Sequence, residues 1–274
     1  VLGVEPARNV ADAAIKKGIP TISQFFGVST ANQLAAQGKH ADLLIGNNVL
    51  AHVPDLNDFV SGMKILLKSD GIITMEFPHL MRLMEEAQFD TIYHEHFSYF
   101  SFITVNRVFA EHGLTIFDVE ELSTHGGALR IFARHMENAA QVISPRVDDL
   151  FSREKAAGFD QLSHYLSFDA RVREIKREIL RFLISAKNEG KSIVGYGAPA
   201  KGNTLLNYCG IRTDFIDYTV DRSPHKQDLL LPGTRIPIYH PDKIKETRPD
   251  YLVILPWNLK AEIMNQMEHI RSWG

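Results

Sequence analysis

Hydrophobic residues gather in short runs over the first third of the chain, separated by longer segments of mixed apolar and polar residues. Four of these runs predict buried β-strands, at residues 1–4, 21–26, 42–50 and 71–77. Pro6, Ser29 and Asp55 follow the first three runs and suit the start of a helix. Strands that alternate with helices in this way predict a parallel sheet with helices on both faces.

The next part of the chain predicts a helix followed by a pair of strands. The helix is expected near residues 104–112, and strand-like runs follow at 115–121 and 128–134. The sequence STHGG forms a short connection between the two runs, and such a connection favours an antiparallel hairpin.

Strand signals are absent between residues 136 and 190, so a helical connector is expected there. A long apolar repeat at 159–186 predicts one of its helices, and Gly190 is expected to cap that connector at its C-terminal end. A second series of strands and helices begins at residue 191, with strands at 192–194 and 215–220 and a last one in DYLVILPWN. This series predicts a smaller Rossmann-like domain.

The composition is that of an ordinary globular protein: 274 residues, 45% hydrophobic and 23% charged. That length suffices for two domains, and the net charge of -3 gives no basic surface for nucleic acid. No apolar run is long enough to span a membrane and no signal peptide is found, so a cytoplasmic protein is expected. Cys209 is the only cysteine, which excludes a disulfide or a cysteine zinc site within these residues. Because the sequence opens inside a strand-like run without an initiator methionine, we expect an excised or truncated polypeptide.

The segment 90–101, DTIYHEHFSYFS, carries the densest set of reactive side chains: Tyr93, His94, Glu95, His96 and Tyr99. Imidazoles exchange protons near neutral pH, a carboxylate orients an imidazole, and a phenol donates to a developing oxyanion. The alternation of aromatic and polar residues also fits a half-buried strand with both histidines on its wet face. A metal site is disfavoured, because the spacing is H-x-H and not H-E-x-x-H and no further ligand cluster is evident.

Polar and aromatic side chains also stand where the predicted strands end. Asn47, Asn48 and His52 end the third strand, at the edge where open parallel sheets bind ligands, although asparagines there also form local turns. Phe25 and Phe26 end the second strand and form either an aromatic wall for a ligand or part of the core.

Glu5 ends the first strand, and two interpretations of it remain open. Helices and strands that end in an antiparallel pair have the order of a class I methyltransferase. In that fold the acid after the second strand binds the ribose hydroxyls of S-adenosylmethionine (SAM). Alternatively, Glu5 interacts with the positive end of the helix that follows it.

The distal sequence GYGAPAKGN, residues 195–203, lies between a predicted strand and a helix. Such a turn can hold phosphate on backbone N–H groups, and Lys201 adds a positive charge. The sequence matches neither G-x-G-x-x-G nor the Walker pattern. Asp221 follows the glycine-rich turn at the distance typical of a ribose-binding acid in dinucleotide sites.

Together these motifs resemble the SAM-dependent sugar C-methyltransferases that act on TDP-activated 4-keto deoxysugars. The resemblance covers nearly the whole chain, and its motifs are GVEP (3–6), NNVLAHVPD (47–55), YHEHFSYFS (93–101), HGGALR (125–130), GYGAPAKGN (195–203) and VDRSPHKQ (220–227). It implies an α/β fold in three parts: a class I methyltransferase domain at 1–135, a helical connector at 136–190, and a Rossmann-like substrate domain at 191–274.

Two features of that family are absent from this sequence. One is an N-terminal zinc module, and zinc is expected only in that missing module. The other is the first, central strand of the methyltransferase sheet with its Gly-rich SAM loop. Without that strand, the strands beginning near Val1 and Asp42 should leave backbone groups unpaired, and SAM binding is expected to be impaired.

The resemblance also implies roles for individual residues. His96 is expected to be the base that removes the proton from sugar C3, with Tyr93 and Glu95 orienting it and stabilising the 4-oxygen. His52 would return or relay a proton, and His94 and Tyr99 are secondary candidates. The further substrate-binding candidates are His125, Arg130, Tyr165, Tyr196, Lys201 and Asn203; for Tyr165, plain helix packing is the alternative. The candidates for contact with SAM are Glu5, Phe25, Phe26, Asn47 and Asn48.

Two other functional classes fit parts of the sequence. An NAD-linked nucleotide-sugar oxidoreductase would use the glycine-rich turn and Asp221, but a clear catalytic Tyr–Lys pair is lacking. A noncatalytic nucleotide-sugar binding protein would carry the histidines incidentally. In each case the expected partner is a small nucleotide-sugar, without nucleic acid or membrane, and the oligomeric state is left open.

Overall fold

A computed structural model describes residues 1–273, with only the backbone described at His125. The residues form two compact units. The first contains Val1–Arg82 and Glu95–Leu162, and the second contains Leu83–His94 and the described residues from Ser163 onward. The two units therefore do not follow one another simply along the sequence.

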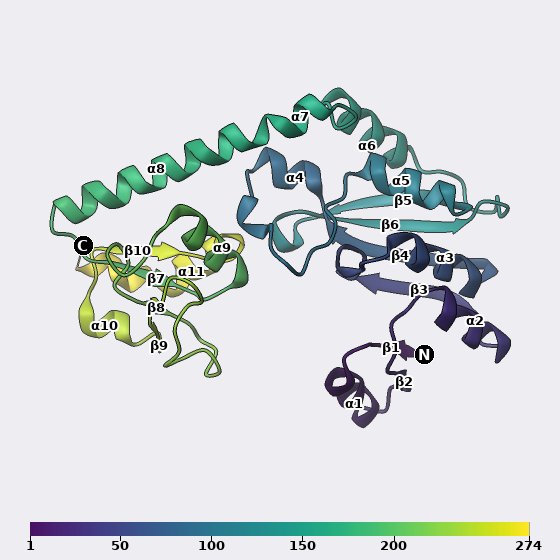
Figure 1. The fold of residues 1–274 in the computed structure, drawn as a ribbon, viewed down its shortest axis with the longest axis horizontal. Coiled ribbons are helices and arrows are strands. Elements are labelled where there is room, and N and C mark those ends of the chain that lie inside the picture. Colours follow the sequence, from purple (N-terminus) through teal and green to yellow (C-terminus); the bar gives the residue numbers. More distant parts are fainter. Residues whose placement is uncertain (274) are drawn as a thin grey trace. The chain divides into compact units, whose positions relative to one another are not determined.

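The first unit combines strands with short helices (Figure 1). Its strands are β1 (Gly3–Val4), β2 (Thr21–Ile22), β3 (Ala41–Asn47), β4 (Leu67–Pro78), β5 (Leu114–Leu122) and β6 (Ala128–His135). Its helices are α1 (Arg8–Lys16), α2 (Val28–Ala36), η1 (Leu50–His52), α3 (Leu56–Leu66), α5 (Phe102–Glu111), η3 (Thr124–Gly126) and α6 (Pro145–Ala156). Helix α4 (Leu80–Glu85) crosses the boundary between the units.

The main sheet of this unit has the order β3-β4-β6-β5. β3 is parallel to β4, whereas β6 is antiparallel to both β4 and β5, so the predicted hairpin is confirmed. Helix α5 buries Phe102, Val105 and Phe109, whose spacing of three and four residues places them on one helix face. These side chains join residues of α3, β4, β5, β6 and α6 in one hydrophobic core.

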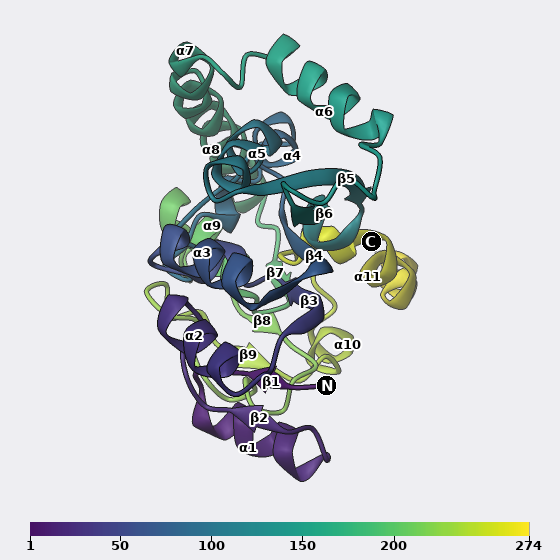
Figure 2. The ribbon, with the colours of Figure 1, turned by 90° about the vertical axis from the view of Figure 1, so that its right-hand side faces the viewer.

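A separate parallel pair, β1 and β2, lies on the side of β3 away from β4 (Figures 1 and 2). Among the described strands, β1 pairs only with β2 and β3 only with β4, as the absence of a central strand led us to expect. A cavity of about 1100 Å³ runs between these two open edges. Leu43 and Ile45 of β3 are 53% and 64% exposed beside it. The strand edge there is available for pairing.

Several predicted element ends differ from the structure for local reasons. The second strand stops at Ile22 and not at residue 26. Ser29 does not cap α2, because Gly27 precedes the helix and Asp58 accepts the N–H of Val28 at 3.2 Å. Asp55 does cap α3, since its side chain accepts the N–H of Asp58 at 2.9 Å.

The second unit contains a four-stranded parallel sheet in the order β10-β7-β8-β9. Its strands are β7 (Ile193–Tyr196), β8 (Thr219–Val220), β9 (Ile238–Tyr239) and β10 (Tyr251–Ile254). Its helices are η2 (Phe89–Thr91), α8 (Phe168–Asn188), α9 (Ala200–Cys209), α10 (Lys243–Thr247), η4 (Trp257–Leu259), α11 (Lys260–Gln266) and η5 (Glu268–Ser272). Helix α7 (Leu162–Leu166) also belongs to it except for its first residue. Side chains of α8 and α9 form one hydrophobic cluster with the sheet, and those of α10 and α11 form another. This is a small Rossmann-like arrangement, as predicted, with β9 as a strand beyond the three that were predicted.

Two kinds of feature are absent from the described residues. Over residues 1–273 there is no helix with the length and apolar character needed to cross a membrane. The same part of the chain contains no group of three or more His, Cys, Asp or Glu side chains arranged to hold a metal ion.

Candidate functional site

The carboxyl end of β3 turns sharply into a short helix that presents His52. Asn48 adopts a left-handed conformation with φ of 54°, which asparagine tolerates better than most residues, and so ends the strand three residues earlier than predicted. Its N–H donates to the carbonyl of Glu76 in β4 at 2.7 Å. The buried Leu50 and Ala51 anchor η1, so that His52 lies directly beyond the strand end.

Residues 93–101, which we name the histidine loop, form irregular turns and not the half-buried strand that was one interpretation. The loop is attached to η1 through its backbone. The N–H groups of Phe97 and Ser98 both donate to the carbonyl of Ala51, at 2.8 and 3.3 Å. Two motifs more than forty residues apart in the sequence, NNVLAH and YHEH, are thereby brought together.

This docking produces a cluster of three polar rings within the first unit. The rings of His52 and His96 meet edge to face, with centroids 4.9 Å apart and planes at 74°. The rings of His96 and Tyr99 meet similarly at 5.5 Å. His52 also lines the 1100 Å³ cavity. The cluster thus reaches the cavity through His52, and two imidazoles and a phenol in contact with one another are suited to moving a proton to or from a bound molecule.

The other members of YHEH are divided between the two units. Tyr93 and His94 belong to the second unit, whereas Glu95 belongs to the first with His96. Tyr93 is half-buried, and His94 and Glu95 are exposed. The four residues of YHEH are consecutive in the sequence, but the first two belong to the second unit and the last two to the first.

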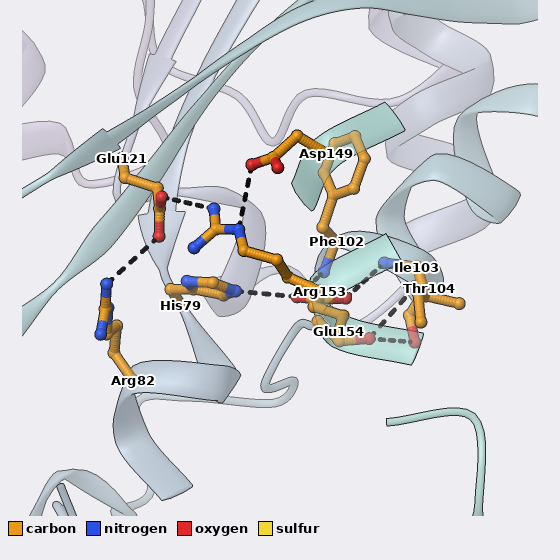
Figure 3. Close-up of polar contacts among 10 residues, drawn as sticks. His79, Arg82, Phe102, Ile103, Thr104, Glu121, Asp149, Arg153 and Glu154 are labelled. Atoms are coloured by element: carbon orange, nitrogen blue, oxygen red, sulfur yellow. Dashed lines mark hydrogen bonds and ion pairs between the residues drawn. The ribbon is translucent and has the colours of Figure 1, made fainter. Parts of the chain in front are cut away.

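The downstream end of the histidine loop is held by a buried carboxylate that the sequence did not reveal (Figure 3). Glu154 of α6 is 0% exposed, and its oxygens accept the N–H groups of Phe102 and Ile103 at 2.7 and 2.8 Å. These are first-turn amides of α5, which have no partner within the helix. A carboxylate there satisfies both amides and faces the positive end of the helix.

His79 completes this arrangement. Its Nε2 lies 2.8 Å from Oε1 of Glu154, and the His79 side chain is only 1% exposed. The backbone of His79 pairs in parallel with Phe100, and the N–H of Leu80 donates to the Phe100 carbonyl at 2.9 Å. The residues that follow β4 and the carboxylate of Glu154 therefore fix the downstream end of the histidine loop, where it enters α5. The position of His79 directly after a strand was the one sequence signal that could have drawn attention to it.

Arg130, a predicted substrate-binding residue, is held by carboxylates in this structure. Its Nη2 donates to Glu76 at 2.9 Å, and its Nη1 lies 3.7 Å from Glu120. Glu76 is 6% exposed and also accepts from the hydroxyl of Thr124 at 3.1 Å. In the β3–β4 ladder Glu76 is the partner of Asn47, so a buried acid stands beside the predicted ligand-binding edge. The side chain of His125 lies outside the described part of the structure.

The residues expected to contact SAM occupy two kinds of surroundings. Oε1 of Glu5 accepts the N–H of Ala7 at 2.8 Å, which agrees with the interpretation of Glu5 as a partner of its own helix. Phe26 packs into the core with its ring centroid 5.3 Å from that of Phe59. Phe25 is 78% exposed and lines the cavity. Of the two phenylalanines, Phe25 is therefore the one available as an aromatic wall.

Alanine substitutions should separate these two phenylalanines. Phe26→Ala should lower the free energy of unfolding by about 2 kcal/mol, below the range for a fully buried ring because Phe26 is only partly buried. Phe25→Ala should change it by no more than about 0.5 kcal/mol. Urea denaturation followed by circular dichroism measures both values. Equal losses in the two variants would contradict the assignment of Phe26 to the core.

Two of the predicted substrate-binding residues of the second unit, Tyr196 and Lys201, already form hydrogen bonds with other side chains of that unit. Tyr196 is 6% exposed, its hydroxyl donates to Gln266 at 3.3 Å, and burial raises the pKa of Tyr196. Nζ of Lys201 donates to Asn258 at 2.9 Å and lies 4.3 Å from the ring centroid of Trp257. The remaining two candidates, Asn203 in α9 and Tyr165 in α7, are half-buried.

The carboxylate of Asp221 accepts hydrogen bonds from backbone N–H groups in and near the glycine-rich turn, so it is not open to a ribose. One oxygen accepts the N–H of Ala198 at 2.7 Å and the other accepts the N–H of Ser223 at 2.8 Å. Lys226 donates to the carbonyl of Ala198 at 2.9 Å from the same side. The feature that suggested a dinucleotide site therefore has a structural role within the turn.

A buried acid, Asp90, lies next to this region of the second unit. It is 4% exposed and accepts the indole N–H of Trp257 at 2.7 Å. Burial raises the pKa of Asp90, while Trp257 and the charge of Lys201 oppose that rise. Burial likewise lowers the pKa of Lys201, with Asp90 opposing the change.

The raised pKa of Asp90 determines the direction in which this residue makes the stability of the protein depend on pH. The folded state holds this proton more tightly than the unfolded state, so stability should fall as pH rises from the ordinary value of 3.8 through the folded pKa. Asp90→Asn keeps an oxygen acceptor for Trp257 but removes the titration. Thermal unfolding from pH 4 to 7 should show the variant gaining stability relative to the wild type as pH rises. A constant difference across that range would contradict the role of Asp90.

Comparison with known proteins places these features in a wider context. Residues 1–119 match a family described as methyltransferase domain, and residues 123–274 match one described as C-methyltransferase C-terminal domain. The C-methyltransferase NovU of Streptomyces niveus is 37% identical over 278 residues, with all of this chain aligned. The chain spans 65% of the length of that relative.

Similarity to solved structures is weaker. The magnesium protoporphyrin IX methyltransferase of Synechocystis PCC 6803, solved with SAH bound, has a TM-score of 0.38 and 15% identity, over 48% of this chain and 63% of its own. A possible histamine N-methyltransferase of Thermotoga maritima has a TM-score of 0.39 and 18% identity, over 48% of this chain and 71% of its own. The sequence matches, and not these structures, identify the family.

Proposed function

This chain belongs to the family defined by the C-methyltransferase C-terminal domain, and we propose that it acts in SAM-dependent methylation of a carbon atom. The observation that carries the proposal is the cluster of His52, His96 and Tyr99 beside the large cavity of the first unit. A carbon nucleophile needs a base, and this cluster provides the groups that can act as one.

The residues around the cavity are compatible with a SAM site. Val4, Pro6, Phe25 and His52 line the cavity, so it reaches the ends of β1, β2 and β3 where parallel sheets bind ligands. Glu5 stands between two lining residues, and we propose that it contacts the ribose hydroxyls while Phe25 packs against the adenine ring. When bound, SAM supplies an electrophilic methyl group.

We propose a nucleotide-linked keto-deoxysugar as the second substrate, methylated at the carbon next to the ketone. His96 removes the proton from that carbon, because a carbon beside a ketone becomes nucleophilic only as the enolate. Tyr93 and Glu95, its neighbours in sequence, orient the base and stabilise the oxygen as it gains charge. His52, whose ring meets that of His96, relays the proton away.

Binding and turnover together test this function. Isothermal titration with SAM, NAD and a TDP-linked 4-keto deoxysugar should give binding of the sugar and binding of SAM, the latter weakened as expected without the first strand and its Gly-rich loop. Mass spectrometry should then detect sugar that carries the deuterated methyl group of labelled SAM. Binding of NAD with oxidation of the sugar would instead identify an oxidoreductase. Binding of the sugar without any turnover would identify a noncatalytic binding protein.

A further inference from the structure

The histidine loop is entered from a segment that folds with the other unit. Leu83–His94 belongs to the second unit, although it lies in sequence between β4 and α5 of the first. The boundary falls between His94 and Glu95, inside YHEH itself. Whatever fixes residues 83–94 in the second unit therefore also fixes one end of the loop that carries His96.

Backbone and aromatic contacts attach this segment within the second unit. The guanidinium of Arg171 in α8 donates to the carbonyls of Met84 and Glu85, at 2.9 and 2.6 Å. The rings of Phe89 and Tyr208 lie 5.2 Å apart between centroids. Both contacts lie at least four residues before the YHEH motif.

A contact closer to the loop joins Trp257 and Asp90. The indole N–H donates to the buried carboxylate at 2.7 Å, three residues before Tyr93. Trp257 lies just after β10. Lys201, whose ammonium group lies over the indole ring, is in α9, the helix that follows β7. The carboxyl ends of parallel strands are the edge at which such sheets bind ligands. Within the second unit, Asp90 is thus tied to the carboxyl edge of the parallel sheet.

We propose that Trp257 is a positioning residue, which holds the upstream end of the histidine loop in place through its hydrogen bond to Asp90. Glu154 holds the downstream end within the first unit, so the loop is fixed at both ends by residues outside it. That Trp257 orders the segment around Asp90 does not depend on the proposed function, whereas an effect of Trp257 on catalysis rests on it.

The two tryptophans of the chain provide a matched pair of variants. Trp257→Phe keeps an aromatic ring under Lys201 but removes the N–H donor. Trp273→Phe removes an indole hydrogen bond of the same unit, to the carbonyl of Pro249 at 3.2 Å, without touching residues 83–94. Asp90→Asn retains an acceptor for the indole.

Hydrogen–deuterium exchange of the intact chain tests the structural part. The amides of Thr91 and Ile92, which donate to Gln88 and Phe89, should exchange about tenfold faster in Trp257→Phe, the effect of losing one hydrogen bond. Trp273→Phe and Asp90→Asn should exchange there as the wild type does. Unchanged exchange in Trp257→Phe, or equally faster exchange in Trp273→Phe, would overturn the proposal.

Kinetics tests the catalytic consequence separately. Trp257→Phe should lower kcat while the KM for SAM, whose proposed site lies in the first unit, stays unchanged. A wild type without methyl transfer would refute the proposed function and leave the exchange result intact. Faster exchange with an unchanged kcat would show that Trp257 orders the segment without positioning the base.

Discussion

Replacing His96 with alanine is expected to slow the exchange of the acidic carbon proton of the sugar with solvent by about 10²–10⁴-fold. The reason is that this step depends directly on the base, whereas SAM binding does not. Deuterium incorporation at the carbon beside the ketone, followed by NMR in the absence of SAM, measures it. Binding of SAM should remain at the wild-type level.

His40→Ala is the matched control for this variant, because His40 is an exposed histidine of the same unit that lines the same cavity at the amino end of β3. It should exchange the proton at the wild-type rate. His52→Ala should fall between the two if it relays the proton from His96. Near-normal exchange in His96→Ala would exclude His96 as the base, whatever the other variants do.

Replacing Glu154 with alanine is expected to lower the free energy of unfolding by about 3–5 kcal/mol, the usual effect of removing one partner of a buried pair. The substitution leaves two first-turn amides of α5 and the ring of His79 buried without their acceptor. Urea denaturation followed by circular dichroism measures the loss.

Asp149→Ala is the control for Glu154. It removes an acid of the same helix, α6, which pairs with Arg153 at 3.1 Å but is 68% exposed. Exposed pairs contribute about 0.2–1 kcal/mol, so the change should stay within that range. A small loss in Glu154→Ala, comparable with that of Asp149→Ala, would show that water replaces the carboxylate at the start of α5.

Much of the site follows from rules that act over short stretches of sequence. Alternating strands and helices predicted the parallel order, and the carboxyl ends of parallel strands meet at one edge. Asn48 and His52 could therefore be placed at a ligand-binding edge from the order of the elements alone. The short connection between β5 and β6 likewise favoured a hairpin.

The unpredicted features depend on partners that are distant in the sequence. Glu154 lies 75 residues from His79 in a charged helix, and no local pattern distinguishes it from the exposed acids around it. Trp257 lies 167 residues from Asp90. The role of Glu5 stayed open for another reason, because a carboxylate that binds its own helix and one that binds a ribose occupy the same position.

The bare side of β3 has a consequence for the behaviour of this polypeptide in solution. Its amide and carbonyl groups face a channel bordered by Leu43 and Ile45, and Asp42, near the start of the strand, is the one charged residue within β3. A second molecule could add a strand there and continue the ladder. Crowded preparations of the polypeptide are thus prone to self-association through sheet extension, and a single lysine in place of Ile45 is the simplest guard against it.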